Sequence, residues 1–479
     1  MPDSPSLVVS CPTGALTGLD RGPTKVFKGI RFARANRFEA PEDVEAWDGV
    51  LDATTFRAQS PQVHGVLEQM LGSSSIPTDE DCLHLNVYTP GCDDRRRPVL
   101  VWVHGGAYVT GGGAMPWYDG SRLAERGDVV VVTLNYRLGA LGFLGVRNSG
   151  TLDQVSALRW VARNIAAFGG DPDDVTVFGE SAGGSAVIAL MAVPSADELF
   201  HRALAMSPSI LQLRHAGHAA KYEADLLEHL DHTSVEELHA VPVDDLLHAQ
   251  SKILVAATAG LKCFAPTEGT DTVPGEILDV AARDPRPLVI GSTRDEMNLF
   301  SVFDPSRSGF TDERLQREFE LRFGSDALEA IEQYRAHRPG LDANMLTSAM
   351  QTDEVFRWPA WALAADRAER GVPTWMYHFD WATPVFGGGL GSCHGVDIPF
   401  AFDNLHRPGV DLFTGTGGER QAVADQFAGA VLSFATTSDP GWTPYDTTRR
   451  ATQRIGPEPG LVADPEPKLR ELWERHDAA

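Results

Sequence analysis

A serine in a tight, glycine-rich turn is the first residue of this sequence that could do chemistry. The segment Gly179-Glu180-Ser181-Ala182-Gly183 follows an apolar run, 175–178, that predicts a buried strand. It precedes a small-residue run, 182–192, that predicts a helix. A strand-to-helix turn of this kind is sharp, so only small side chains fit on either side of the serine, and the turn lifts the hydroxyl out of the sheet. This setting predicts a nucleophile rather than an idle turn serine.

A nucleophilic serine needs hydrogen-bond donors for the oxyanion that its attack creates. His104-Gly105-Gly106 follows another predicted buried strand, 99–103, and glycine there lets backbone N–H groups approach a substrate closely. We expect the N–H groups of Gly105 and Gly106 to be donors, with that of Ala182 as the third. Alone, the His-Gly-Gly segment is slightly better explained by an ordinary strand-end turn; the serine turn downstream favours the catalytic interpretation.

The elements that must position these segments alternate between strand and helix. Further strands are predicted at 7–9, 25–30, 128–133, 287–291 and 374–379, and helices at 153–168 and 419–433. Alternation of this kind predicts an α/β fold with a mostly parallel sheet and helices on both sides. Helix-rich stretches at about 211–285 and 311–370 are expected to form a cap over the carboxyl ends of the strands.

Motifs spread along the chain resemble those of the type B carboxylesterases, a group of α/β-hydrolases that includes para-nitrobenzyl esterases and cholinesterases. Besides the serine turn, the matching segments are 80–90, 135–139, 153–154 and 164–172. The likeness extends from about residue 10 to residue 450. It implies a single α/β-hydrolase domain over residues 1–479, with a large twisted sheet, helices on both faces and helical cap elements.

The resemblance also implies the two partners of the serine. The family's acid is a glutamate in a Gly-x-x-x-Asp-Glu setting, which Gly291–Glu296 fits, so Glu296 is the expected acid and Asp295 the competing choice. The family's base lies in a Gly-x-x-His segment, which Gly391–His394 fits. The chain order Ser181, Glu296, His394 is that of α/β-hydrolases. In such a triad the carboxylate orients the imidazole and stabilises the imidazolium that forms.

These residues imply a serine carboxylic-ester hydrolase that acts on small to medium acyl esters through an acyl-enzyme. The same triad would hydrolyse carbamates, amides or thioesters. A non-catalytic interaction homologue is a further alternative, disfavoured because all three triad positions are filled. Candidate substrate-pocket residues, each as well explained by plain packing, are Trp117, Tyr118, Leu213, Phe264 and Phe386.

Two loops and one serine carry weaker expectations. The loops at 59–79 and 382–392 are candidate lids or pocket walls, although a surface connection explains each equally well. Glycine runs at 387–389 and 415–418 lack the preceding strand and the spacing of a nucleotide-binding loop. The family has Gln-Ser-Gly where this chain has Met206-Ser207-Pro208, so a role for Ser207 is left open.

Composition limits the partners of the protein. With 41 basic and 66 acidic residues the formal charge is −25, which repels phosphate backbones and anionic lipids, so neither nucleic acid nor membrane is expected as a partner. Five cysteines without a CxxC pattern predict no metal site and no disulfide framework, and no cofactor is expected. The family's upstream half-cystine is replaced by Ser60. We therefore expect a cytoplasmic monomer or homodimer that takes a small-molecule ester.

Overall fold

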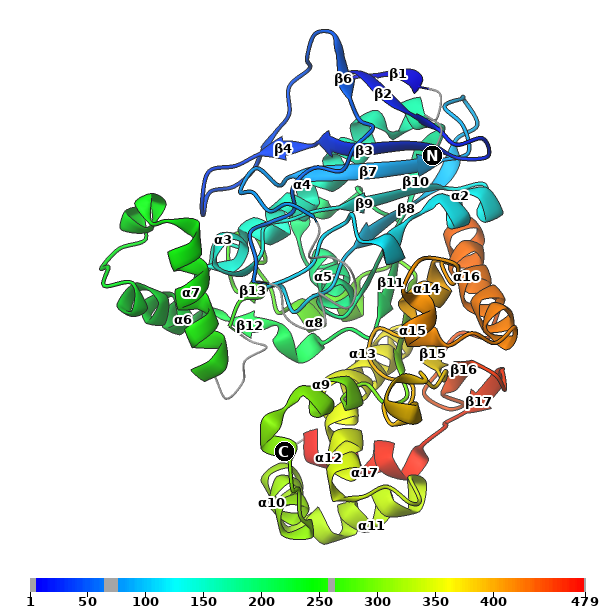
Figure 1. The fold of residues 1–479 in the computed structure, drawn as a ribbon. Helices are drawn as coiled ribbons and strands as arrows, with labels where there is room; N and C mark the ends of the chain where they lie inside the picture. The colour runs from blue at the N-terminus through cyan, green and yellow to red at the C-terminus, as the bar shows by residue number, and fades with distance from the viewer. Residues whose placement is uncertain (1–5, 64–75, 257–262, 478–479) are drawn as a thin grey trace.

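A mixed sheet of thirteen strands runs through the centre of the computed structural model, which describes residues 6–63, 76–256 and 263–477 (Figure 1). Its strand order is β1-β2-β3-β7-β9-β8-β10-β11-β14-β15-β16-β17, with β6 beside β2. The strands are β1 (Ser6–Cys11), β2 (Gly14–Asp20), β3 (Lys25–Arg31), β6 (Val50–Asp52), β7 (His84–Thr89), β8 (Arg97–Val103), β9 (Val130–Leu134), β10 (Gly170–Glu180), β11 (Arg202–Met206), β14 (Leu288–Thr293), β15 (Thr374–Phe379), β16 (Ala451–Ile455) and β17 (Gly460–Ala463). Two short pairs lie apart, β4 (Ala33–Arg34) with β5 (Glu42–Asp43) and β12 (Arg214–His215) with β13 (Thr267–Glu268).

The middle of the sheet is parallel. Strands β9, β8, β10, β11, β14, β15 and β16 pair in parallel in that order, while the pairs that join β1 to β2, β2 to β3, β3 to β7, β7 to β9 and β16 to β17 are antiparallel. Parallel strands need crossover connections, and helices supply them here. The predicted fold class, an α/β-hydrolase fold with a large, mostly parallel sheet, is confirmed.

Both faces of the sheet are covered, as the residues of β8 demonstrate. Val99, Val101 and Val103 enter one hydrophobic core, whereas Leu100 and Trp102 enter a second core on the other side. Successive side chains of a strand point to opposite faces, so both faces must be packed against other elements. Every residue of β9 is buried for the same reason. The strand predicted at 128–133 is therefore present as β9 and is buried on both faces.

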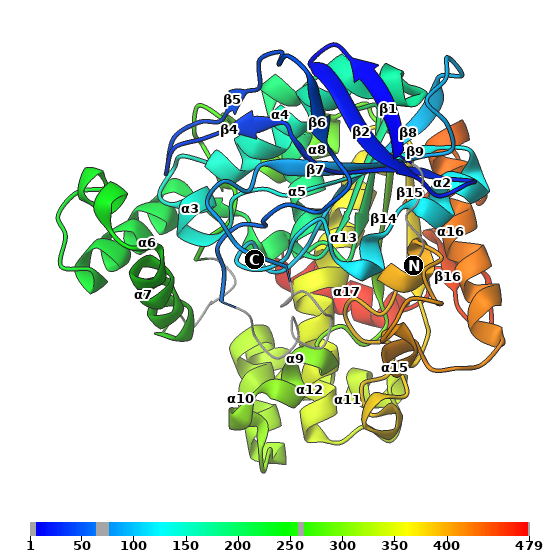
Figure 2. The same cartoon turned by 45° about the horizontal axis from the view of Figure 1, so that its top comes forward.

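The two cores are closed by different helices (Figures 1 and 2). Residues of α4 (Ser149–Asn164), α5 (Ala182–Leu190), α8 (Ile277–Arg283) and α13 (Trp358–Glu369) belong to the first core. Residues of α2 (Ser121–Gly127), α14 (Ile398–Ala401), α15 (Val410–Thr414) and α16 (Glu419–Thr437) belong to the second. The short helix α3 (Gly139–Phe143) packs against α4. No helix in the described part of the chain is long and apolar enough to cross a bilayer.

Two helical groups project from this layered body in both views. One consists of α6 (Ala216–His229) and α7 (Val243–Ala256), drawn in green at the left of Figure 1. The other lies at the bottom of the same view and contains α9 (Asn298–Phe303), α10 (Asp312–Phe323), α11 (Ala327–His337), α12 (Ala343–Thr352) and α17 (Pro467–Asp477). Most of these helices fall in the two stretches that the sequence marks as helix-rich.

Some elements differ from the sequence-based expectation. The helix expected at 153–168 begins earlier, at Ser149, and its last four residues form a 3-10 turn, Ile165–Phe168. Strand β11, with the sequence Arg-Ala-Leu-Ala-Met, was not expected, because alanine, leucine and methionine favour helix. Its position between β10 and β14 supplies backbone partners on both sides, so tertiary pairing overrides the local preference.

Candidate active site

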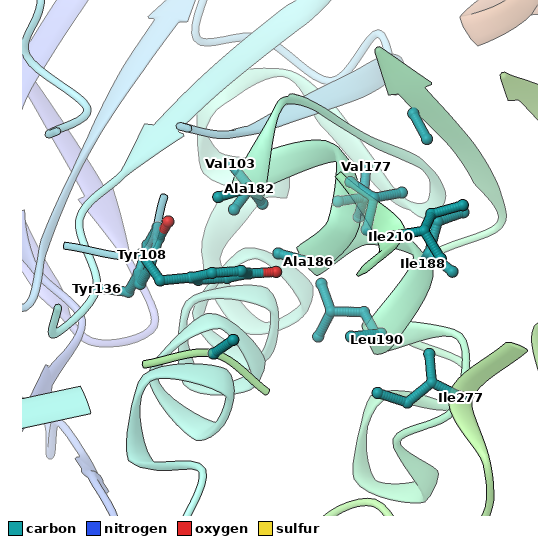
Figure 3. Packing of buried hydrophobic residues seen from close by; sticks show 14 of the residues in the cluster. Val103, Tyr108, Tyr136, Val177, Ala182, Ala186, Ile188, Leu190, Ile210 and Ile277 are labelled. Carbon is teal, nitrogen blue, oxygen red and sulfur yellow. The ribbon is translucent and has the colours of Figure 1, made fainter. Parts of the chain in front are cut away.

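Ser181 occupies the turn between β10 and α5, in a backbone conformation that few residues other than glycine adopt. Its φ and ψ are 60° and −125°, and its N–H donates to the Met206 carbonyl at 2.9 Å. A Cβ on Gly179 would lie 2.6 Å from the Val103 carbonyl oxygen, and one on Gly183 would lie 2.1 Å from it. The start of α5 therefore lies directly against the end of β8, and Figure 3 shows Ala182 and Val103 side by side. Glycine is required on both sides of the serine because the two chains approach so closely.

A short hydrogen bond joins His394 to Glu296. The Nδ1 atom of His394 lies 2.5 Å from Glu296 Oε2, and the other carboxylate oxygen accepts the N–H of Thr293 at 2.6 Å. The neighbouring Asp295 has different partners, the N–H of Ser392 at 2.9 Å and the guanidinium of Arg294. Of the two candidate acids, the structure therefore brings Glu296 to the imidazole.

One cavity of about 220 Å³ collects most of the expected site residues. Ser181, His394, Gly105 and Gly106 line it, while Glu296 and Ala182 are fully buried behind its wall. The candidate pocket residues Trp117 and Tyr118 also line it. The remaining wall is mostly apolar and includes Met115, Leu299, Phe300, Phe356, Ile398 and Phe413.

Three of the candidate pocket residues do not line this cavity. Phe264 is only 1% exposed and belongs to the hydrophobic core, and Leu213 packs against the same core. Phe386 is 62% exposed on the 382–392 loop, at a φ of 52°. All three lie near the expected motifs in sequence, but in the folded chain two of them pack in or against the core and the third is exposed to solvent. Of the other loop, residues 64–75 lie outside the described residues.

The serine that the family resemblance left open is also absent from the cavity. Ser207 is buried, and its N–H donates to the Gly291 carbonyl at 2.8 Å. Two residues further on, Ser209 does line the cavity, and its hydroxyl donates to Gln212 Oε1 at 2.6 Å. Sequence reasoning missed this pair, since neither residue belongs to a motif.

The backbone N–H groups expected to hold an oxyanion are available. Within the described residues, no hydrogen bond uses the N–H of Gly105, Gly106 or Ala182. A Cβ on Gly105 would lie 3.0 Å from the Ser181 Cβ, so this loop lies directly against the serine turn. Gly106 has a φ of 108°, a conformation that a side chain would strain.

Glu180 is the principal residue of the site that sequence reasoning missed. Its Oε1 atom lies 3.2 Å from His394 Nε2, the nitrogen on the far side of the ring from Glu296. Ser181 Oγ makes no hydrogen bond to any residue in the described ranges, so Nε2 faces Glu180 in this arrangement. The available signal was position, because the residue directly before Ser181 in the turn cannot lie far from the residues around that serine.

The charges around the imidazole shift its pKa. Burial lowers the pKa of His394, but the carboxylates of Glu180 and Glu296 and the hydrogen bond to Glu296 outweigh it and raise the pKa to about 9. Burial raises the pKa of Glu180 and of nearby Asp397 above the ordinary range for carboxyl groups. Three buried carboxyl groups thus share the surroundings of one imidazole, and they favour its charged form.

A serine at the carboxyl end of a central parallel strand, in a cavity that is also lined by a histidine following a later strand, defines this molecule as an α/β-hydrolase. Similarity to known proteins identifies the family within the α/β-hydrolases. Residues 5–465 match the family model described as "Carboxylesterase family", and the chain belongs to that family.

Relatives of known activity resemble nearly the whole chain. Para-nitrobenzyl esterase of Bacillus subtilis (strain 168) is 35% identical over 97% of this chain and 98% of its own. Phenmedipham hydrolase of Pseudarthrobacter oxydans is 34% identical over 94% of this chain and 95% of its own. The solved carboxylesterase of Geobacillus stearothermophilus superposes with a TM-score of 0.87 at 36% identity and covers 97% of this chain and 99% of its own. The protein is an enzyme that hydrolyses carboxylic esters.

Proposed function

We propose that Ser181, Glu296 and His394 are the catalytic triad of this esterase. The observation that carries the proposal is the 2.5 Å hydrogen bond from His394 Nδ1 to Glu296, at a cavity that Ser181 also lines. That bond fixes the tautomer in which Nε2 can accept a proton. The proposal requires Nε2 to turn from Glu180 toward Ser181 Oγ when substrate binds, since hydrogen bonds of this kind are often loose before substrate is bound.

In the proposed reaction, His394 Nε2 takes the proton of Ser181 while Oγ attacks the ester carbonyl carbon. The oxyanion receives hydrogen bonds from the N–H groups of Gly105, Gly106 and Ala182. The imidazolium then gives its proton to the leaving alcohol oxygen as the ester bond breaks. Water, deprotonated by the same imidazole, attacks the acyl-enzyme, and the proton returns to Ser181 as the acid leaves.

The decisive test is Ser181→Ala. If the triad works as a unit, kcat for a para-nitrophenyl ester falls on the order of 10⁴–10⁶-fold. A sulfonyl fluoride probe should label the unsubstituted protein once per chain, and peptide mass analysis should find the label on Ser181. The Ser207→Ala variant serves as a matched control, because Ser207 is a buried serine outside the cavity, and it should be labelled like the unsubstituted protein. Undiminished hydrolysis by Ser181→Ala would remove this serine from the mechanism.

For the substrate we propose an ester with a small to medium acyl group and an apolar or aromatic alcohol group. The small cavity and its wall of aromatic side chains support this choice, as does the likeness to a para-nitrobenzyl esterase. A hydrolysis screen over acyl chain length, with a carbamate, an amide and a thioester included, tests it. We expect kcat/KM to be highest for the esters and to decline with long acyl chains.

We further propose one catalytic domain over residues 1–479, with cap elements at 211–285 and 311–370, in a cytoplasmic monomer or homodimer. Gln212 from the first stretch and Phe356 from the second line the cavity, which supports a cap role. All five cysteines are unpaired, Cys82 among them, and the Ser60 hydroxyl accepts the N–H of Leu138. Free thiols suit a reducing compartment. Light scattering tests the assembly, and fractionation of the source cells tests the location.

A further inference from the structure

A short π-helical turn interrupts a long helix beside the cavity. The turn, η10 (Asp353–Arg357), joins α12 to α13 without a change of direction into a loop. Pro359 lies just beyond it, near the start of α13. A proline has no N–H for the carbonyl four residues earlier, and its ring crowds that carbonyl, so the regular α-helical pattern breaks here. Turns of this kind often occur at functional sites because they shift a few side chains out of helical register.

The first consequence of the turn concerns His394. The ring of Phe356 lines the cavity, and its centroid lies 4.9 Å from that of the imidazole, with a 41° angle between the ring planes. A second ring, Phe300 of α9, lies 5.2 Å from the same imidazole. His394 follows β15 on a loop, whereas the two phenylalanines belong to helical segments. Aromatic contacts at these distances restrict the rotation of the imidazole and interact favourably with its charged form.

The next residue of the turn holds the backbone that leads to Glu296. The guanidinium of Arg357 is 4% exposed and donates to the carbonyls of Thr293 at 3.3 Å and Arg294 at 2.8 Å. Its charge is balanced by ion pairs with Asp353 and, at 3.2 Å, with Glu466. Because Glu296 itself accepts the Thr293 N–H, the guanidinium and the carboxylate hold the same few backbone atoms.

The end of α12 holds the other side of Glu296. The N–H of Met297 donates to the hydroxyl of Thr352, which is fully buried, at 3.0 Å. The backbone before Glu296, at Thr293 and Arg294, and the residue after it, Met297, are therefore hydrogen-bonded to the Thr352–Arg357 segment. Fixing the main chain on both sides of the acid leaves its carboxylate little freedom relative to His394.

We propose that the segment Thr352–Arg357 is a positioning element for the triad: Phe356 restricts the imidazole of His394, and Arg357 with Thr352 fixes the turn that carries Glu296. This proposal rests on the triad proposed above. Phe356 and Arg357 are adjacent in sequence, yet Phe356 contacts the imidazole of His394 whereas Arg357 holds the backbone that leads to Glu296.

The main test is Phe356→Leu, which keeps an apolar side chain at the cavity and removes the ring. A misplaced catalytic group costs up to about 100-fold in rate, so we expect kcat for a short ester to fall about 10- to 100-fold with a smaller change in KM. The pKa of His394 should also fall, because the ring no longer favours the imidazolium, so hydrolysis should set in at a lower pH. Phe413→Leu is the matched control: it makes the same change in the same cavity without a ring contact to His394, and it should alter KM rather than the pH profile.

A second variant tests the other half of the element. Arg357→Lys keeps the charge beside Asp353 and Glu466, but its single ammonium nitrogen replaces two: Nη1, which binds these carboxylates, and Nη2, which donates to the two carbonyls. We expect kcat to fall about tenfold and the rate of labelling by a sulfonyl fluoride to fall in parallel. A thermal unfolding curve accompanies each variant, and only variants folded at the assay temperature are compared.

The outcomes separate this proposal from the one it rests on. If Ser181 is not labelled in the unsubstituted protein, the triad itself is wrong. If Ser181 is labelled but Phe356→Leu keeps the original kcat and pH profile, or changes them only as Phe413→Leu does, the positioning role is overturned. A fall in kcat with a shifted pH profile in Phe356→Leu, and slower labelling in Arg357→Lys, supports it.

Discussion

At the residue scale, His394 has the most demanding surroundings in the molecule. A general base must be uncharged to accept a proton, yet Glu180 and Glu296 both favour the imidazolium. From the sequence alone, an ordinary histidine pKa of about 6.5 was the natural expectation. The structure replaces it with a higher value, because the carboxylate of Glu180, which no motif identified as part of the site, adds to the effect of Glu296.

The pH dependence of the free enzyme follows from this arrangement. Below its raised pKa of about 9, His394 is protonated and cannot accept the Ser181 proton. We therefore expect kcat/KM to rise with pH through neutrality toward about 9, rather than to level off just above 6.5. Initial rates with a neutral ester at low concentration, corrected for spontaneous hydrolysis, measure this. A plateau that begins at pH 7 would contradict the raised pKa.

Replacing Glu180 should shift the rise of kcat/KM with pH to lower pH. Glu180→Gln removes a carboxylate 3.2 Å from Nε2, so the pKa of His394 falls and kcat/KM levels off at a lower pH. We expect the pH at which kcat/KM levels off to fall by about one unit, which corresponds to about 1.4 kcal/mol of lost interaction with the imidazolium. The exposed Glu369→Gln is the control for a change of net charge alone, and its profile should superimpose on that of the unsubstituted enzyme. Identical profiles for both variants would refute the role of Glu180.

At the scale of the elements, local patterns predicted the fold and its motifs well. Strand β15 occupies the residues expected for it, 374–379, and the serine turn joins a strand to a helix as expected. Such patterns succeed because strand periodicity and glycine at a sharp turn are local properties of the sequence. The candidate acid and base could be proposed for a different reason, since each is embedded in a short segment resembling a family motif.

The cavity wall could not be predicted in the same way. Phe300, Phe356 and Phe413 come from three distant helical segments that meet only in the folded chain. Phe264 and Leu213 appeared equally suitable by residue type and by distance from the motifs along the chain. Which apolar side chain faces a cavity depends on how whole helices pack, and a single sequence holds little information about that packing.

The close approach of α5 to β8 gives a stability prediction for this element. Gly183→Ala places a Cβ 2.1 Å from the Val103 carbonyl, so backbone atoms must move, and we expect a loss of about 1–3 kcal/mol in the free energy of unfolding. Gly429→Ala, inside α16, is the matched control. Its Cβ would find only Arg126 Nη2, at 3.9 Å, so alanine should stabilise the helix by about 0.5–1 kcal/mol. Urea unfolding curves of both variants measure these changes in the free energy of unfolding. A similar loss of stability in both variants would refute the prediction.

At the scale of the whole molecule, net charge governs which esters approach the cavity. The formal charge of −25 repels anionic substrates over a distance set by the ionic strength. The Debye length shortens from about 30 Å at 0.01 M salt to about 8 Å at 0.15 M. We expect kcat/KM for a carboxylate-bearing ester to rise severalfold over this range, while that for its uncharged methyl analogue stays constant. An equal response from both esters would show that long-range charge has no part in substrate entry.

The sheet order has a consequence for how this enzyme loses activity. Ser181 follows β10, Glu296 follows β14 and His394 follows β15, and between β10 and β14 lies β11, whose neighbours are parallel to it on both sides. The three groups of the proposed triad thus keep their relative positions only while four neighbouring strands keep their alignment. The strands of that block lie inside the sheet and open last, whereas the turns that carry the three residues beyond the strand ends open more readily. During heating, hydrolysis should therefore cease at a lower temperature than the one at which bulk helical signal is lost, so turnover reports on these turns before spectroscopy detects unfolding.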